Sequence, residues 1–107
     1  MKLKLDENLS RHLKPLLTGL GHDVLTAAAL REERMLLTLD LEFADLRKYP
    51  PGSHPGIILF RPPSFGPLSV NKFVIDFVNS ADLSELTSCV AIVDPVNVRV
   101  RSPEKRP

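Results

Sequence analysis

The chain has 107 residues, of which 43% are hydrophobic and 25% charged, and its formal net charge is +1 at pH 7. This size and composition are typical of one globular domain and argue against a disordered chain. The single cysteine, Cys89, excludes an internal disulfide framework and favours a reducing compartment. No apolar run approaches the roughly 20 residues of a membrane span. We therefore expect a cytoplasmic protein with no membrane segment.

The first half of the chain alternates short strands with helical patterns. Lysines alternate with leucines over residues 1–5, which predicts a strand. Leucines then recur at the spacing of one helical face over residues 9–20, where Asn8 or Ser10 would be the N-cap and Pro15 is expected to bend the helix. A strand, a short helix, a buried strand, and a turn with a helix are expected next, at residues 22–26, 27–34, 35–38 and 40–48.

The second half begins with a loop rich in proline and glycine at residues 49–56, followed by a buried strand at residues 57–60. Pro67 suits the first position of an amphipathic helix. After it come a capping box with a short turn and a terminal hairpin, at residues 82–85, 89–93 and 96–100. The pattern predicts one α/β domain over residues 1–101, with a mostly parallel central sheet, flanking helices and a C-terminal antiparallel hairpin, and then a frayed tail at residues 102–107.

Acidic residues come directly after two of the predicted strands. Asp6 follows the first strand and Asp40 follows the strand at residues 35–38. Because ligands of open α/β sheets bind beyond the carboxyl ends of the strands, neighbouring strands would bring both carboxylates within reach of one cation. Mg²⁺ and Mn²⁺ prefer such oxygen ligands. Glu42 would join this set if the chain stays extended, since residues two apart point the same way.

Three further residues are candidates for binding substrate. Thr38 would orient Asp40 through its hydroxyl, and Asn8 would contact the metal shell or a phosphate. Arg61 follows the strand at residues 57–60 and would bind a phosphate. Each candidate also has a purely structural alternative: acids and Asn8 cap helices, Thr38 is an ordinary strand residue, and Arg61 is a solvated cation before two prolines. No histidine or cysteine cluster has the spacing of a zinc site.

Four motifs occur in order along the chain: Leu5-Asp6-Glu7-Asn8-Leu9, Gly21-His22-Asp23-Val24, Leu37-Thr38-Leu39-Asp40-Leu41-Glu42-Phe43 and Pro55-Gly56-Ile57-Ile58. Over residues 2–101 the sequence resembles the small PIN-like family often described as a toxin-associated domain of unknown function. The resemblance implies a three-layer PIN-type fold with a metal-dependent ribonuclease site, in a toxin–antitoxin pair. It also matches Asp6, Asp40 and Glu42 with the three acids of that family's motifs.

The chain departs from this family in one segment. Proteins similar to it carry a longer stretch between the Gly-His-Asp-Val strand and the next strand, with a helix that bears another acid. Here Glu32 and Glu33 are the only acids available, and neither lies in a matching motif. The chain therefore lacks one of the acids that the resemblance implies.

The leading interpretation is a ribonuclease in which Asp6 and Asp40 hold Mg²⁺ or Mn²⁺. The cation would activate water and stabilise the charge of the transition state, and Glu42 would be a further ligand or orient the attacking water. Single-stranded RNA as the substrate is implied by the resemblance alone.

Two other interpretations remain open. The missing acid, together with Phe65, Phe73 and Phe77 near a predicted surface helix, favours a catalytically impaired PIN-like module that binds a partner protein. A receiver-like phosphoacceptor would also use paired acids, but no lysine follows a later strand where phosphate chemistry needs one. The open sheet edge and the apolar helix predict a homodimer or a complex with an antitoxin-like protein.

Overall fold

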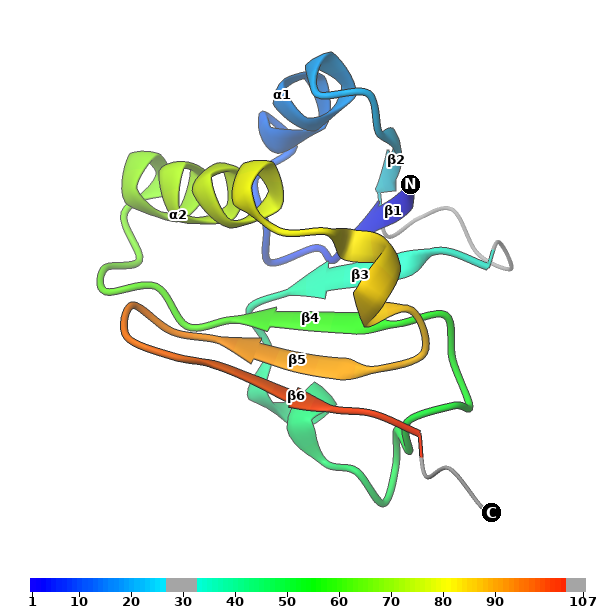
Figure 1. Cartoon of the computed structure of the whole chain (residues 1–107). Coiled ribbons are helices and arrows are strands. Elements are labelled where there is room, and N and C mark those ends of the chain that lie inside the picture. Colours follow the sequence, from blue (N-terminus) through cyan, green and yellow to red (C-terminus); the bar gives the residue numbers. More distant parts are fainter. Residues whose placement is uncertain (27–32, 104–107) are drawn as a thin grey trace.

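A six-stranded sheet forms the middle of the molecule, and two helices lie on one of its faces (Figure 1). The computed structural model describes residues 1–26 and 33–103. Its strands are β1 (Lys2–Leu5), β2 (Asp23–Thr26), β3 (Met35–Thr38), β4 (Ile57–Phe60), β5 (Val90–Val93) and β6 (Val98–Arg101). Its helices are α1 (Leu13–Gly19) and α2 (Pro67–Ser80), and the 3-10 helices are η1 (Leu41–Ala44) and η2 (Leu83–Leu86).

The order of the strands in the sheet is β2-β1-β3-β4-β5-β6. Strands β1 to β5 are parallel, and β6 runs antiparallel to β5. The chain moves from β1 outward to β2, returns to the other side of β1 and then adds β3, β4 and β5 in sequence. The direction of winding therefore reverses between β1 and β3, and such a reversal is where open α/β sheets bind ligands. The predicted parallel sheet and C-terminal hairpin are both confirmed.

The register of the strands explains how the core forms. Leu5 lies beside Leu37, and Leu37 lies beside Ile58, so these side chains point to the same face of the sheet. This face packs against α1 and α2 in one apolar cluster, to which α2 contributes Val70, Val74 and Val78. The opposite face is covered in part by η1, which packs against β4 (Figure 1). All four residues of β4 are buried, as expected for a strand covered on both faces.

One buried cation ties the N-terminal ends of three strands together. The guanidinium of Arg34 donates from Nη1 to the backbone oxygen of Asp23 at 2.8 Å and to that of Leu3 at 3.5 Å. It also forms an ion pair with the carboxylate of Asp23 at 3.2 Å. Arg34 precedes β3, whereas the two residues that it binds belong to β2 and β1. This contact fixes β2 and β3 on either side of β1.

Several element boundaries differ from the sequence expectation. Helix α1 begins at Leu13 rather than at residue 9, because the hydroxyl of Ser10 accepts a hydrogen bond from the N–H of His12 in a preceding turn. Pro15 is the third residue of α1 and removes no intrahelical hydrogen bond, since first-turn N–H groups have no partner within a helix. The helix expected at residues 40–48 is reduced to η1.

The last strand begins at Val98 rather than at residue 96. The carboxylate of Asp94 accepts hydrogen bonds from the N–H groups of Val96 at 2.8 Å and Asn97 at 2.6 Å, which draws these residues into the turn. The helix expected at residues 27–34 falls largely on residues 27–32, and most of the expected tail falls on residues 104–107; both lie outside the described residues. Neither described helix is long and apolar enough to cross a membrane.

Candidate functional site

The residues after β1 and β3 meet at the point where the sheet reverses its winding. The N–H of Asp6 donates to the backbone oxygen of Leu37 at 2.9 Å, which extends the β1–β3 ladder one residue beyond β1. Asp6 is half-buried there, and Thr38 beside it is fully buried. The strands that precede Asp6 and Asp40 are thus neighbours, as the metal-site interpretation of the sequence requires.

Three donors surround the carboxylate of Asp6. The hydroxyl of Thr38 donates to Oδ2 at 2.7 Å, and Nδ2 of Asn8 donates to the same oxygen at 3.2 Å. The N–H of Glu7 donates to Oδ1 at 3.0 Å. Because hydrogen bonds to an ionised acceptor are the stronger kind, these contacts hold the carboxylate in one orientation.

Asn8 joins the segments that follow the two strands. Its Oδ1 accepts a hydrogen bond from the N–H of Leu39 at 3.1 Å, while its Nδ2 contacts Asp6 and lies 3.4 Å from the hydroxyl oxygen of Thr38. Asn8 is thus not the N-cap of α1, whose N-cap is His12. Its structural role, which sequence patterns did not indicate, is to fix the two acid-bearing segments to each other.

Thr38 acts differently from the expectation. Its hydroxyl oxygen accepts a hydrogen bond from the backbone N–H of Asp40 at 3.0 Å and donates its proton to Asp6. It therefore orients the carboxylate of Asp6 and the backbone of Asp40, not the carboxylate of Asp40. This arrangement requires β1 and β3 to be neighbours, so it could not be read from one strand alone.

Asp40 is exposed and is the N-cap of η1, where its Oδ1 accepts a hydrogen bond from the N–H of Glu42 at 3.0 Å. One of the two carboxylate oxygens of Asp40 therefore serves as a helix cap, which was the alternative to metal binding. Glu42 lies inside η1, so the extended chain that would have aligned it with Asp40 does not form. Its carboxylate pairs with Nζ of Lys48 at 2.9 Å, an interaction that raises the pKa of Lys48.

A divalent ion such as Mg²⁺ needs oxygen donors that converge on one point. Within residues 1–26 and 33–103, no three histidine, cysteine, aspartate or glutamate side chains are grouped so that they could hold a metal ion. The predicted three-acid set of Asp6, Asp40 and Glu42 is therefore not brought together. Asp6 and Asp40 remain, and Mg²⁺ is commonly held by one or two carboxylates with waters and substrate phosphates. Asp6 has three hydrogen-bond donors on its carboxylate, and Asp40 has one oxygen that does not cap η1.

The charge around these two acids is not balanced by side chains of the described residues. The ion pairs of the described residues join Arg34 to Asp23, Arg47 to Asp45, Lys48 to Glu42 and Lys72 to Asp76. None of them involves Asp6 or Asp40. Within the part of the chain that the structure describes, neither acid therefore has an ion-pair partner.

Arg61 lies at the same end of the sheet but on the side of β5. Its N–H donates to the backbone oxygen of Val93 at 2.7 Å, and its side chain is exposed. The pKa of Asp94 is lowered mainly by the backbone N–H groups of Asn97 and Val96, with a smaller contribution from the charges of Arg99 and Arg61. The charge of Arg61 thus acts on the hairpin turn, and the structure does not join it to the acid pair.

A cavity of about 270 Å³ adjoins Asn8 at this edge. Asn8 and Leu39 line one side of it, and Phe65 and Asn71 line another. Phe65 is 72% exposed, which is unusual for a phenylalanine in a chain of this size. Because the walls come from three separate parts of the chain, no local pattern predicted that Phe65 and Asn8 would line one cavity.

Comparisons of the chain with models of protein families, with curated proteins and with solved structures gave no match.

Replacing Thr38 by valine should lower the free energy of unfolding by about 1–2 kcal/mol, because Asp6 and the N–H of Asp40 each lose a hydrogen-bond partner while the side-chain shape is kept. Urea denaturation measures this cost. In an Asp6→Ala background the cost of Thr38→Val should fall by about 1 kcal/mol, since the two residues interact. Full additivity of the two changes would contradict the role given to the hydroxyl.

Proposed function

We propose that this protein is a metal-dependent ribonuclease of the PIN-like type, with Asp6 and Asp40 as its metal-binding acids. The observation that carries the proposal is the position of these two acids just beyond the carboxyl ends of the neighbouring strands β1 and β3, at the reversal point of the sheet, with no cationic side chain of the described residues in an ion pair with either. The motif order that resembles PIN-like proteins supports the same assignment.

Each residue of the site has a distinct task in this proposal. Asp6 binds the cation in the orientation set by Thr38 and Asn8. Asp40 binds it through the oxygen that does not cap η1. Mg²⁺ or Mn²⁺, when bound, supplies charge that stabilises the transition state of phosphodiester hydrolysis and lowers the pKa of water. Glu42 is proposed to act only from outside the metal shell, by orienting water.

Single-stranded RNA is the proposed substrate, and the cavity beside Asn8 gives this proposal a physical basis. Bases of single strands stack on exposed aromatic side chains, and Phe65 offers such a surface in the cavity that Asn8 also lines. Arg61, at the same end of the sheet, is proposed to attract the phosphates flanking the cleaved bond.

The Phe65→Ala variant should raise KM for a single-stranded RNA about tenfold, because one stacked base contributes about 1–3 kcal/mol. Its kcat should change much less, since Phe65 does not contact the acids. Steady-state cleavage of a labelled oligonucleotide gives both constants. Leu68→Ala is the matched control, as Leu68 is 86% exposed on the same segment but does not line the cavity. A loss confined to kcat would contradict the stacking role.

A non-catalytic interaction module is the second candidate function. The use of Asp40 as a helix cap and the pairing of Glu42 with Lys48 favour it, because both contacts are complete without a metal ion. In that case the acids of the site are structural, and divalent ions should bind no better to this chain than to a variant lacking one of them.

Thermal melts with and without Mn²⁺ distinguish the two candidates. Mn²⁺ should raise the melting temperature of the parent protein by mass action and that of Asp40→Asn much less, if Asp40 is a ligand. Without metal, the substitution should be nearly neutral, because asparagine also caps helices well. An equal shift in both proteins, or no shift in either, would show that Asp40 is a cap only.

The remaining parts of the proposal concern the setting of the enzyme. We propose a cytoplasmic location, which the lone thiol of Cys89 suits, and a role as the toxin of a toxin–antitoxin pair, which the motif resemblance supports. The exposed apolar residues of the chain support the expected homodimer or complex with an antitoxin-like protein.

A further inference from the structure

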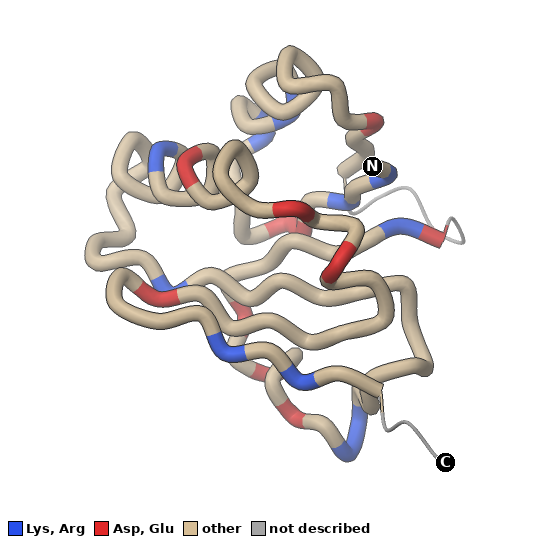
Figure 2. The backbone as a smooth tube through the Cα atoms, in the orientation of Figure 1, with Lys and Arg blue, Asp and Glu red and all other residues tan. Residues whose placement is uncertain are grey.

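Strand β6 is an open edge of the sheet with two chemically different faces. All four of its residues are exposed, and valine alternates with arginine along it. Val98 lies beside Val93 and Val100 beside Ala91, so the valines point to the face covered by α2. Arg99 and Arg101 therefore point to the opposite face. Figure 2 shows these two basic positions along the strand.

The backbone of β6 also has groups directed away from the sheet. The N–H of Asp94 donates to the backbone oxygen of Asn97 at 3.0 Å, which makes these two residues a hydrogen-bonded pair. Because such pairs alternate along an antiparallel ladder, Arg99 and Arg101 bond to β5, and the N–H and C=O groups of Val98 and Val100 point outward. A row of outward backbone groups is a template for one more strand.

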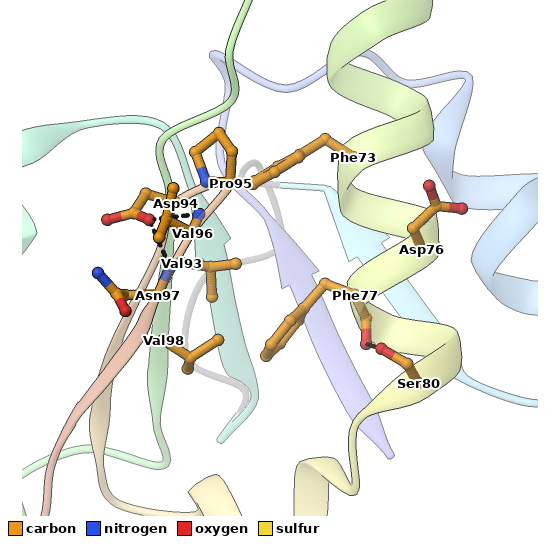
Figure 3. A pocket seen from close by; sticks show the side chains of 10 residues that line it. All are labelled: Phe73, Asp76, Phe77, Ser80, Val93, Asp94, Pro95, Val96, Asn97 and Val98. Carbon is orange, nitrogen blue, oxygen red and sulfur yellow. Dashed lines mark hydrogen bonds between the residues drawn. The ribbon is translucent and has the colours of Figure 1, made fainter.

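An apolar groove lies next to this edge, between α2 and the β5–β6 hairpin (Figure 3). Its volume is about 340 Å³, and Phe73 and Phe77 of α2 face Pro95 and Val98 of the hairpin across it, while Val96 also lines it. Val96 is 85% exposed and Val98 50%. Apolar side chains on an added strand would cover Val98 and Val100 and close the open side of this groove.

A second copy of the chain is a poor occupant of this edge. Two copies of β6 would pair through the outward groups of Val98 and Val100, so these residues must lie opposite each other or opposite themselves. The two antiparallel registers of this kind with the largest overlap place Arg99 opposite Arg99 or opposite Arg101. Like charges in directly opposite positions destabilise a sheet. Within the described residues no carboxylate forms an ion pair with either arginine. A strand with acids at these positions would instead be attracted.

We propose that β6 binds an extended segment of a partner protein in which acidic and apolar residues alternate, and that this segment adds a seventh strand to the sheet. The outward N–H and C=O groups of Val98 and Val100 pair with its backbone. Its acidic side chains face Arg99 and Arg101, and its apolar side chains face the valines. The interaction does not involve Asp6, so it is independent of the metal-binding role proposed for that residue.

Fluorescence anisotropy with a short labelled peptide, in which valine alternates with glutamate, tests this proposal. The whole chain should bind this peptide more tightly than a peptide with lysine in place of glutamate. Reversing both charges, with Arg99→Glu and Arg101→Glu, should weaken binding about tenfold and should reverse the preference between the peptides. The same reversal at Arg11 and Lys14, which are exposed around the start of α1, should leave binding unchanged.

The backbone part is tested separately with Val100→Pro, which removes an outward N–H and no bond to β5. This variant should lose most of its affinity for the peptide. Hydrogen exchange on the parent protein should show the amides of Val98 and Val100 protected when the peptide is bound, and this decides the matter if the proline variant does not fold. Equal binding of both peptides, or no added protection of these amides, would overturn the proposal. The proposal would also be overturned if the variant with Arg99→Glu and Arg101→Glu bound single-stranded RNA more weakly but bound the peptide as the parent does.

Discussion

The Asp6→Asn variant should lose divalent-dependent RNA cleavage by a factor of about 100 or more. Loss of a residue that only supports a metal ligand already costs 10–100-fold, and Asp6 is proposed as a ligand itself. Asparagine keeps the size of the side chain but replaces one carboxylate oxygen with an NH₂ donor. The two oxygens of Asp6 accept separate hydrogen bonds from the hydroxyl of Thr38 and the N–H of Glu7, and the variant loses one of these acceptors. Cleavage of a labelled single-stranded RNA at saturating Mn²⁺ measures the loss.

Two control variants make this result interpretable. Asp76→Asn removes a carboxylate that pairs with Lys72 on α2 and should leave cleavage unchanged. Glu42→Gln should have a much smaller effect than Asp6→Asn, because Glu42 lies in η1 and pairs with Lys48. Expression of the parent chain should also slow growth of the host cell, and Asp6→Asn should not. Wild-type cleavage by a folded Asp6→Asn variant would refute the proposed site.

The Leu37→Ala variant should lower the free energy of unfolding by about 3–4 kcal/mol, within the range measured for buried leucines. Leu37 is fully buried in β3, between Leu5 of β1 and Ile58 of β4, and these two neighbouring strands cannot collapse into the space left behind. The effect should reach the site as well, since the backbone oxygen of Leu37 accepts the N–H of Asp6. Urea denaturation followed by circular dichroism measures the change.

Leu68→Ala provides the comparison for this prediction. Leu68 is 86% exposed on α2, so the same chemical change should alter the free energy of unfolding by less than about 0.5 kcal/mol. If both variants lowered the free energy of unfolding by a similar amount, the effect at Leu37 would not depend on its burial. That result would contradict the packing described for β3.

The sequence by itself determined the elements that depend on local patterns. Continuous apolar runs predicted β3 and β4, since central strands of a parallel sheet are buried on both faces. Pro67 and the repeat of apolar residues after it predicted α2. The positions of Asp6, directly after β1, and of Asp40, two residues after β3, indicated the edge at which a site would form, because this edge follows from strand direction alone.

Boundaries and turns were decided by side chains that compete for backbone groups. Asp94 holds the N–H groups of Val96 and Asn97, so β6 starts later than its apolar pattern suggests. Asp40 holds the N–H of Glu42, so the chain turns into η1 and moves Glu42 away from the acid pair. In both cases hydrogen bonds from an aspartate to nearby backbone N–H groups outweighed a pattern of side chains.

The composition of the site was decided only by the tertiary structure. The placement of β1 between β2 and β3 put Thr38 within hydrogen-bonding distance of Asp6, and it let Asn8 join the two acid-bearing segments. The cavity with Phe65 likewise needs three separate segments. These contacts join residues about 30 positions apart in the chain. Sequence patterns record spacing along one element, whereas strand order sets which elements become neighbours.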